Sequence, residues 1–445
     1  MNIPDYALRC LNRLEEAGFP TYLVGGCVRD SVLGLQPADF DMCTAALPEE
    51  TEALFSDCQL VLAGKKHGTV GVVMGENVVE ITTFRTEGGY TDNRHPEWVR
   101  FVPTIEQDLA RRDFTVNAMA WSPYRGFADP FGGRSDLEKK VLRAVGDPAA
   151  RFQEDSLRIL RGLRFSVRYG LVPEENTFRA MKEKRHLMEN LARERVFEEL
   201  CKLLVLVKDE DLLRFAPILA AVIPELEPMI GFDQHSPYHA YDLYRHTACV
   251  TGSLPADLTL RWAGLLHDTG KIATFTRDSD GRGHFYGHAK VSAQIANRVL
   301  LGLKAPTKLR ENVTELIGLH MTKIEPEKKV VRRWLSRLGQ DTMEQLLTLQ
   351  RSDMGSKGTG KDRGMEQFSR LRQLMDEIRA DRGCLSLKGL AVNGHDLMAL
   401  GFQGQEIGIC LNTLLEQVLD EKLPNERTAL LATAKEMAGN QNTPT

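Results

Sequence analysis

The sequence predicts a small α/β domain at the N-terminus, followed by an elongated all-α body. Two observations support this fold class. Short runs of β-branched and aromatic residues, bounded by Gly, Pro and Asp, occur before Asp147. Beyond that point the apolar residues recur with the 3.6-residue period of helices, almost to the C-terminus. A chain of 445 residues has room for about three domains, each with its own core.

The individual elements follow from local patterns. An amphipathic helix is expected over residues 1–18, which lack the basic and apolar regions of a signal peptide. Four strands are expected, at Tyr22–Val24, Phe40–Cys43, Thr69–Met74 and Val78–Phe84. Polar, glycine-containing stretches should interrupt the helical body near Asp278–His284 and Ser352–Gly364. The predicted segments are a head (1–146), a helical neck (147–228), a further helical domain (229–360) and a tail (361–445).

Composition narrows the class of protein. The net charge is −4 and the pI about 6.3, so a polyanion would have to bind through local basic faces. Eight scattered cysteines without a CxxC pair argue against a zinc ribbon or a disulfide framework and favour reduced thiols. No apolar run approaches the roughly 18 residues of a membrane span. We therefore expect a cytoplasmic protein without a membrane partner, and the sequence indicates no oligomeric state.

A glycine pair follows the first expected strand. Gly25 and Gly26 stand where this strand turns into a helix that is expected to begin near Val28. Glycines let the backbone approach a ligand closely, and a helix N-terminus offers unpaired N–H groups to phosphate. Arg29 would add a guanidinium fork for a triphosphate. A plain strand–turn–helix connection would need the same glycines, so both interpretations stay open.

Two carboxylates stand two residues apart in the next expected strand. Asp39 and Asp41 would project from one face while Phe40 enters the core. Neighbouring carboxylates repel each other unless a cation lies between them, and hard oxygen ligands suit Mg²⁺. Glu80 either completes this cluster or faces solvent. The pattern predicts a catalytic Mg²⁺ site for an attacking hydroxyl and a leaving pyrophosphate.

Four segments give this pattern a family context. They are GGCVRDSVLGLQPADFD (25–41), RRDFTVNAMAW (111–121), DPFGGRSDLEKKVLRAVGDP (129–148) and RFQEDSLRILRGLRF (151–165). Their order and spacing resemble those of class II tRNA nucleotidyltransferases, the CCA-adding enzymes and bacterial poly(A) polymerases. The resemblance implies a head of the DNA polymerase β nucleotidyltransferase superfamily. It also implies Mg²⁺, CTP and ATP as substrates, tRNA as partner, and addition of C, C and A to the tRNA 3′ end.

The fourth segment contains a possible base-selecting pair. Asp155 and Arg158 are three residues apart and would be neighbours on one helix face. A carboxylate accepts from an amino group and a guanidinium donates to a ring nitrogen, a combination that fits cytosine and adenine but not uracil or guanine. The pair would then replace a template base. An ordinary surface ion pair is the alternative.

The resemblance assigns roles to the residues around this pair. Glu154, with Asp155 and Arg158, matches the nucleotide-selecting motif of the family. Arg161 and Arg164 would contact nucleotide phosphates or neighbouring residues. Arg112 and Asp113 would lie beside the nucleotide, in the motif that discriminates the ribose.

Residues 85–97, RTEGGYTDNRHPE, have the composition of a mobile loop. In the family a loop at this place helps to switch specificity from C to A, and enzymes that add only CC lack it. Its presence disfavours CC-only addition and leaves complete CCA addition and A-only addition open.

A second set of possible ligands lies between residues 238 and 353. His267 and Asp268 adjoin at the end of an apolar helix, and imidazole with carboxylate suits a divalent transition metal. The complete set is His246, His267, Asp268, His288, His320 and Asp353. This order resembles the HD superfamily of metal-dependent phosphohydrolases, which is fused to some bacterial CCA-adding enzymes. The resemblance implies a metal site, with His288 and His320 permitting a second metal. The domain would hydrolyse a phosphomonoester or cyclic phosphate at an RNA end, or serve as a scaffold that positions tRNA.

Residues 394–427 resemble the tail of the same family, which holds the tRNA elbow. Within this enzyme class, the rival hypotheses are an A-adding tRNA nucleotidyltransferase and a poly(A) polymerase. The acidic balance of the chain and the HD-like segment count against the polymerase. From another class comes a metal-dependent phosphohydrolase whose head only binds RNA, which the paired aspartates disfavour.

Overall fold

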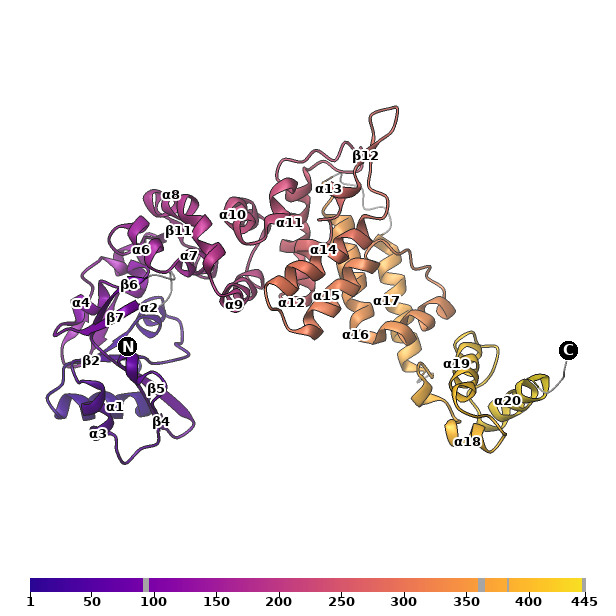
Figure 1. Ribbon diagram of the computed structural model, residues 1–445, viewed down its shortest axis with the longest axis horizontal. Helices are drawn as coiled ribbons and strands as arrows, with labels where there is room; N and C mark the ends of the chain where they lie inside the picture. The colour runs from indigo at the N-terminus through magenta and orange to yellow at the C-terminus, as the bar shows by residue number, and fades with distance from the viewer. Residues whose placement is uncertain (91–95, 359–364, 382–383, 442–445) are drawn as a thin grey trace. The chain divides into compact units, whose positions relative to one another are not determined.

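The computed structural model describes residues 1–90, 96–358, 365–381 and 384–441. Two compact units result, Met1–Glu227 with Leu301–Ala305, and Pro228–Leu300 with Pro306 onward. Strands gather in the indigo-to-purple N-terminal part, and the ribbon from α7 onward is almost entirely helical (Figure 1). The predicted fold class, an α/β head followed by a helical body, is confirmed. The division into four segments stays a prediction.

The head contains a seven-stranded mixed sheet in the order β3-β4-β5-β2-β1-β8-β9. Strands β1 and β2 are antiparallel, whereas β2 and β5 are parallel. The bounds are β1 Thr21–Val24, β2 Met42–Thr44, β3 Leu60–Val61, β4 Thr69–Met74, β5 Asn77–Thr83, β8 Ala120–Ser122 and β9 Gly126–Ala128. All four strands expected from the sequence therefore lie in one sheet.

One predicted strand boundary is wrong. Asp39, Phe40 and Asp41 precede β2 rather than lying within it. Strand β1 ends at Val24, whose N–H still bonds to the Asp41 carbonyl at 3.1 Å, and the chain then turns at Gly25. The aspartates thus lie where the ladder with β1 runs out, at the edge of the turn.

The other elements of the first unit surround this sheet. Helix α1 is amphipathic, as expected, and buries Ala7, Cys10, Leu11 and Leu14. The helices are α1 Asp5–Glu16, α2 Gly26–Val32, α3 Pro48–Leu54, α4 Ile105–Leu109, α5 Gly133–Glu138, α6 Pro148–Glu154, α7 Leu157–Tyr169, α8 Glu175–Lys184, α9 Arg193–Leu204 and α10 Asp209–Val222. A parallel pair, β10 (Val141–Leu142) and β11 (Val172–Pro173), shows that short strands do occur beyond Asp147.

The predicted loop over residues 85–97 is largely a hairpin. Strands β6 (Arg85–Tyr90) and β7 (Pro96–Phe101) pair antiparallel, from Arg85 opposite Phe101 to Tyr90 opposite Pro96. Aromatic and β-branched residues of β7 favour this ladder despite the polar composition of β6. Residues 91–95 lie outside the described part of the chain.

The second unit is helical, with one short hairpin of β12 (Thr276–Arg277) and β13 (Gly283–His284) at the predicted polar stretch. Its helices are α11 Leu243–Ser253, α12 Leu258–Leu266, α13 Lys271–Thr274, α14 His288–Gly302, α15 Thr307–Leu319, α16 Lys328–Gly355, α17 Met365–Ala380, α18 Gly394–Met398, α19 Gln405–Leu419 and α20 Arg427–Gln441. Helix α16 is kinked at Gly339, where φ is 77°. It continues through Ser352 to Gly355, so the second predicted interruption begins later than expected, and residues 359–364 are not among those described.

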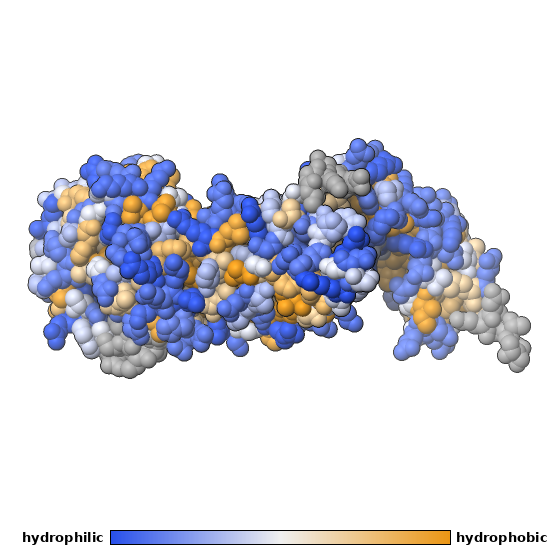
Figure 2. Space-filling model, turned by 90° about the horizontal axis from the view of Figure 1, so that it is seen from above, coloured by the Kyte–Doolittle hydropathy of each residue, from blue (hydrophilic) through white to orange (hydrophobic). Residues whose placement is uncertain are grey.

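Hydrophilic residues cover most of the face in Figure 2, and hydrophobic residues appear there in small separate groups. In the described residues, no helix combines the length and apolar character that crossing a bilayer would require. The eight cysteines are all free thiols, as the sequence predicts.

Candidate functional site

The turn after β1 brings the glycine motif against a half-buried arginine, Arg112. Gly25 has φ 68° and ψ −119°, a conformation that disfavours residues with a Cβ. A Cβ at this position would lie 2.7 Å from Nη1 of Arg112. Helix α2 begins directly at Gly26, two residues before the predicted start. The glycine therefore permits the close approach of Arg112 to this turn.

The three predicted head carboxylates lie on two neighbouring segments of the head. Glu80 belongs to β5, and Asp39 and Asp41 belong to the segment that leads into β2, the strand beside β5. We call these three residues the carboxylate edge. Met42 pairs with Ile81 in the parallel ladder of β2 and β5, so one residue earlier Asp41 stands opposite Glu80. Phe40 is buried and packs edge-to-face on Tyr6 with a centroid distance of 6.4 Å. Because side chains alternate, Asp39 and Asp41 point away from that core.

The pKa of the Asp41 carboxyl is raised because protein atoms and two other carboxylates lie near it. Although the residue as a whole is exposed, neighbouring atoms enclose its carboxyl group. This desolvation, with the negative charges of Glu80 and Asp39, raises the pKa of Asp41 to about 6, while Arg112 opposes the shift. Crowded oxygen donors of this kind fit a hard cation such as Mg²⁺.

Arg29 is buried and fully engaged by protein groups. Its Nε donates to Asp30 at 2.9 Å, Nη1 to Oδ1 of Asn117 at 2.5 Å and Nη2 to the hydroxyl of Tyr169 at 2.5 Å. The guanidinium also stacks over the Tyr169 ring, 4.3 Å from its centroid. Arg29 therefore ties α2 to α7, and its predicted grip on a triphosphate stays a prediction.

The arginine pair of the second motif surrounds a buried carboxylate. Asp108 accepts from Arg111 at 3.0 Å and from Arg112 at 3.4 Å. Arg112 is also among the charges that act on Asp41. Arg112 thus lies between the buried Asp108 and the carboxylate edge of the sheet.

Asp113 pairs with helix α7. Arg161 donates to its Oδ2 and Asn117 to its Oδ1. Burial alone would raise the pKa of Asp113, but Arg161 and the Asn117 amide outweigh burial and lower it to about 2. Asn117, which contacts both Arg29 and Asp113, is a linking residue that the sequence interpretation missed, although it lies inside the RRDFTVNAMAW motif.

The predicted pairing of Asp155 with Arg158 on one helix face is wrong. Helix α6 ends at Glu154 and α7 starts at Leu157, so Asp155 occupies the break between them with φ −138°. Its Oδ1 accepts from the N–H of Leu157 at 3.1 Å and its Oδ2 from Arg195 at 3.4 Å. This side-chain bond to the backbone competes with continuation of the helix.

Arg158 turns the other way. Its Nη1 lies 2.6 Å from Glu154, and its Nη2 donates to the carbonyl of Arg111 at 3.2 Å. Arg164 pairs with Glu199 at 2.7 Å. Arg158 and Arg164 thus bind acidic residues of their own unit. The structure brings Glu154, Asp155 and Arg158 into one corner, where Arg158 pairs with Glu154 and Asp155 pairs with Arg195.

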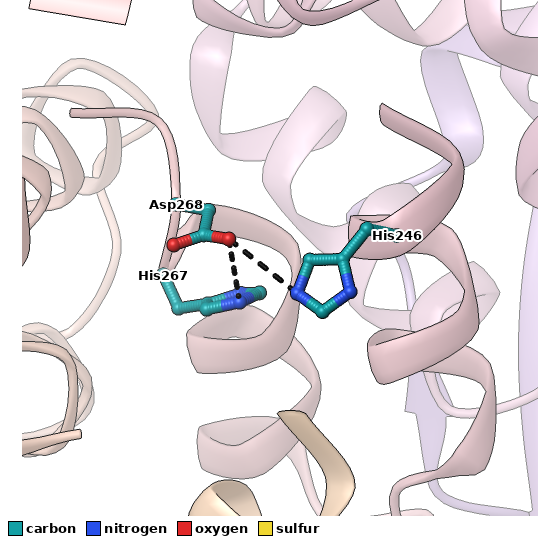
Figure 3. A group of neighbouring side chains, drawn as sticks. All are labelled: His246, His267 and Asp268. Atoms are coloured by element: carbon teal, nitrogen blue, oxygen red, sulfur yellow. Dashed lines mark ion pairs between the residues drawn. The ribbon is translucent and has the colours of Figure 1, made fainter. Parts of the chain in front are cut away.

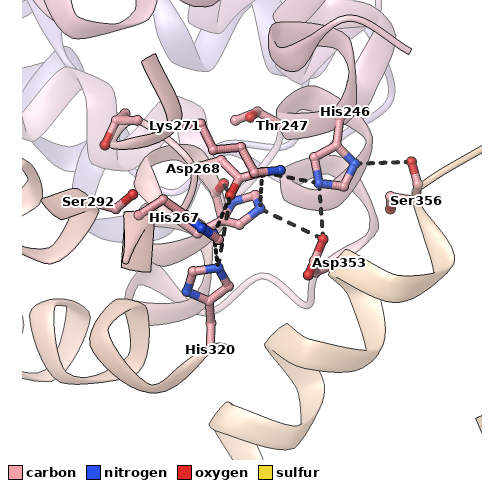
Figure 4. Close-up of polar contacts among 12 residues, drawn as sticks. His246, Thr247, His267, Asp268, Lys271, Ser292, His320, Asp353 and Ser356 are labelled. Atoms are coloured by element: carbon pink, nitrogen blue, oxygen red, sulfur yellow. Dashed lines mark hydrogen bonds and ion pairs between the residues drawn. The ribbon is translucent and has the colours of Figure 1, made fainter. Parts of the chain in front are cut away.

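The six residues of the second predicted site converge in one cluster, and Figures 3 and 4 label all of them except His288. They come from five helices or helix ends. His246 lies in α11, His267 and Asp268 follow α12, His288 begins α14, His320 ends α15 and Asp353 lies near the end of α16. All six are buried. Sequence positions more than a hundred residues apart thus meet in one place, as predicted.

Each imidazole is oriented by its own backbone hydrogen bond. The Nδ1 atoms of His246, His267, His288 and His320 lie 3.2, 2.8, 2.8 and 2.6 Å from the carbonyls of Ser356, Gly264, Phe285 and Ile317. A carbonyl can only accept, so Nδ1 carries the proton in each ring. The lone pair of each Nε2 is then directed into the cluster, as in histidines that ligate metals.

Asp268 lies between two groups of imidazoles. Its Oδ2 is 3.5 Å from Nε2 of His246 and 3.2 Å from Nε2 of His267. Its Oδ1 is 3.4 Å from Nε2 of His288 and 3.9 Å from that of His320. In each group the ligand atoms lie within 4.8 Å of one another. Asp353 closes the first group, 3.0 Å from Nε2 of His246.

The donor set fits a divalent transition metal. Nε2 of His246 and Nε2 of His267 are buried without a hydrogen-bond donor and face carboxylate oxygens of Asp353 and Asp268 at 3.0 and 3.2 Å, an arrangement that is costly unless a cation satisfies both. Burial, with the charge of His267, lowers the pKa of His320 to about 4 and favours the neutral form that binds metals. Among the described residues, two groups of possible metal ligands have all their ligand atoms within 4.8 Å of one another, and both groups lie in this cluster.

A cavity of about 240 Å³ opens beside the cluster. Asp268, His288 and Asp353 line it, together with residues that the sequence interpretation missed. Buried Lys271 lies 2.8 Å from Oδ2 of Asp268 and 2.9 Å from Gln234. Burial, with the charge of Lys271, lowers the pKa of His239, another lining residue, to about 3. Lys271 follows Asp268 by one helical turn, a spacing that would have revealed it.

Comparison with known proteins identifies the family. A CCA-adding enzyme from Levilactobacillus brevis is 34% identical over 435 residues, which is 96% of this chain and 96% of that protein. The chain belongs to the CCA-adding enzyme family. A Streptococcus suis family member is 45% identical over 233 residues, 50% of this chain and 57% of that enzyme. Over that shorter alignment, the chain thus spans little more than half of the relative.

Family models and solved structures agree. Residues 21–143 match the poly A polymerase head domain, 170–230 the probable RNA and SrmB-binding site of polymerase A, and 284–434 a putative second domain of tRNA nucleotidyltransferases. The crystal structure of the Bacillus stearothermophilus CCA-adding enzyme in complex with CTP matches with a TM-score of 0.68 at 25% identity, covering 99% of both chains. The resemblance of the head motifs to the CCA-adding family is thus confirmed.

Proposed function

We propose that this protein adds C, C and A to the 3′ end of tRNA without a template, using CTP and ATP and releasing pyrophosphate. The observation that carries the proposal is the full-length match to a CCA-adding enzyme. The structural basis is the carboxylate edge of Asp39, Asp41 and Glu80 beside the Gly25 turn. Its relatives are bacterial enzymes, and its free cysteines suit the cytoplasm.

In this proposal the head carboxylates hold Mg²⁺, which neutralises charge on the triphosphate and lowers the pKa of an attacking hydroxyl. Glu80 supplies an oxygen donor from β5, and Asp39 and Asp41 supply two more from the segment that leads into β2. Gly25 and Gly26 offer a backbone turn for the triphosphate. Arg112 holds positive charge between Asp108 and this edge.

Base selection is assigned to the corner of Asp155 and Arg158. The carboxylate of Asp155 is only half-buried, and its bond to Arg195 is long at 3.4 Å, so Oδ2 can accept from an amino group. Arg158 is held by Glu154 and the Arg111 carbonyl, which fixes its guanidinium. Cytosine and adenine share the amino donor beside a ring nitrogen that this combination would recognise.

The test uses three tRNA transcripts that end at the discriminator base, at C or at CC, each incubated with CTP, ATP or both. Products that end at CCA on all three transcripts support the proposal. Extension of the CC transcript alone would show an A-adding enzyme, and long A tails would show a poly(A) polymerase.

A second candidate function is favoured by the histidine–aspartate cluster. We infer that the second unit is a metal-dependent phosphohydrolase of the HD type acting on a phosphomonoester or a cyclic phosphate at an RNA end. The orphaned Nε2 atoms of His246 and His267 support this inference, because two buried unpaired acceptors are costly in a domain that serves only as scaffold. A bound divalent metal would supply Lewis acidity and lower the pKa of water. Hydrolysis of the phosphomonoester or of the cyclic phosphate with Mn²⁺ or Ni²⁺, lost in Asp268→Asn, would support it. Equal release by both proteins would contradict it.

A further inference from the structure

Three consecutive ring-bearing side chains line the cavity beside the cluster. His284, Phe285 and Tyr286 line it together with the metal-ligand candidates Asp268 and Asp353. Its volume of about 240 Å³ lies just below the range of roughly 300–1,000 Å³ typical of small-ligand pockets. A single terminal nucleotide, partly projecting into solvent, therefore suits this cavity better than a long polymer segment.

Two of these rings form a parallel pair that is held in place. The His284 and Tyr286 rings are stacked with centroids 5.4 Å apart and an angle of 6° between their planes. Nε2 of His284 lies 2.9 Å from Oδ2 of Asp278, and Nδ1 lies 3.4 Å from the Tyr286 hydroxyl. His284 lies in β13, and Tyr286 follows it two residues later. Both ring nitrogens of His284 are thus engaged, which fixes the orientation of the pair.

The side chain of Tyr286 is highly exposed to solvent, although it lines the cavity beside the cluster. It is 77% exposed, the largest fraction among the exposed large hydrophobic residues described. Leaving an aromatic ring in water forfeits the stabilisation that its burial would bring. Aromatic rings displayed in this way serve single-stranded nucleic acids as stacking surfaces for bases.

The charge inside the cavity complements a phosphate. Lys271 lies 2.8 Å from Oδ2 of Asp268, and Lys357 is a second lysine among the residues that line the cavity. The lining therefore grades from buried residues, Asp268 and Lys271 among them, to the exposed ring of Tyr286. A nucleoside phosphate has the same sequence of groups, with the phosphate at one end and the base at the other.

We propose that Tyr286, with His284 behind it, is a stacking platform for the base of the nucleoside whose phosphate enters the cluster. This platform makes the site selective for nucleoside phosphates over phosphate esters without a base. The proposal rests on the phosphohydrolase function inferred above. In the reaction concerned, water adds across one P–O bond of a cyclic phosphate and leaves a phosphomonoester and a free hydroxyl.

The experiment compares two substrates with the full chain in Mn²⁺. Guanosine 2′,3′-cyclic phosphate carries a base that the head is expected to reject, and glycerol 1,2-cyclic phosphate carries no base. Tyr286→Ala should raise KM for the guanosine substrate about 10-fold or more, with little change in kcat or in hydrolysis of the glycerol substrate. Tyr286→Phe should restore the wild-type KM, because the ring alone stacks. Tyr124→Ala, which removes another exposed tyrosine in the other unit, is the matched control.

The stacking proposal would be overturned if Tyr286→Ala impaired hydrolysis of both substrates equally, or if it left KM for the guanosine substrate unchanged. If the wild type hydrolyses neither substrate, the phosphohydrolase function fails, and binding of guanosine 3′-monophosphate by calorimetry decides the platform separately. Binding weakened by Tyr286→Ala and kept by Tyr286→Phe would still support it. Equal affinities for the wild type and Tyr286→Ala would overturn it.

Discussion

Asp113 and Arg161 form a two-point ion pair, with Nε and Nη2 of the arginine 2.9 and 2.7 Å from the same carboxylate oxygen. The residues are 48 positions apart and belong to different motifs. Asn117 holds the second oxygen of Asp113 at 3.0 Å. The pair therefore fastens the segment that carries Arg112 to helix α7, the helix that also contains Arg158.

This pair should stabilise the first unit in a pH-dependent way. The pKa of Asp113 falls from 3.8 to about 2 on folding, so its stabilisation is fully present above pH 4 and is lost as the pH falls toward 2. A shift of this size corresponds to about 2 kcal/mol at neutral pH. Urea unfolding of Asp113→Asn should show a loss of this order at pH 7 that shrinks between pH 4 and pH 2. The exposed carboxylate variant Glu183→Gln should show neither effect, and a pH-independent loss in Asp113→Asn would contradict the ionic cause.

The sequence predicts the sheet of the head well because local patterns determine it. Phe40 enters the core, and the flanking aspartates follow from the alternation of side chains along extended backbone. The partner of Asp155 could not be predicted in this way. Spacing indicates Arg158, but the carboxylate caps the N–H of Leu157 and breaks the helix, which leaves Arg195, 40 positions away, as its partner.

In the histidine cluster too, the sequence predicts local features but not contacts between distant residues. Six ligands could be predicted because their order along the chain is distinctive. The carbonyls that orient His267, His288 and His320 each lie three residues earlier, but the bond from His246 to Ser356 spans 110 positions and could not be predicted. His239 was missed for the same reason, because only packing places its ring against that of His246.

Asp41→Asn should abolish nucleotide addition while the fold is kept. The substitution removes negative charge from the crowded edge that Glu80 shares, so the site loses its affinity for Mg²⁺. A decrease of at least about 10²–10³-fold in the rate of CTP addition to a tRNA transcript is expected. Glu76→Gln, in the exposed turn between β4 and β5, is the control and should add CTP at the wild-type rate. Undiminished addition by Asp41→Asn would remove Asp41 from the catalytic set, and Asp39→Ala tests the second ligand in the same assay.

Asp155→Ala should relax selection against UTP and GTP. Without the carboxylate, the amino group of cytosine or adenine loses its hydrogen-bond acceptor. The carbonyl of uracil or guanine no longer meets a carboxylate that it cannot pair with. Discrimination between these nucleotides should therefore fall by about 10-fold or more. Incorporation of each single nucleotide into a transcript that ends at the discriminator base gives the ratio directly. Glu183→Ala, an exposed carboxylate on α8, should keep wild-type ratios. Unchanged ratios in Asp155→Ala would show that selection lies elsewhere.

His246→Gln and His320→Gln should separate the two halves of the cluster. Each removes one imidazole on a different side of Asp268, so each should lower the bound Mn²⁺ or Ni²⁺ measured by elemental analysis. Metal at 100 times its Kd stabilises a folded protein by about 2.7 kcal/mol, which should raise the Tm of the wild type and raise it less in each variant. His186→Gln, which changes an exposed histidine of the first unit, should retain full metal binding.

Because the cluster and the carboxylate edge lie in separate compact units, CTP addition should persist in every variant of the cluster. Coincident loss of metal binding and CTP addition would mean that the two sites do not act independently.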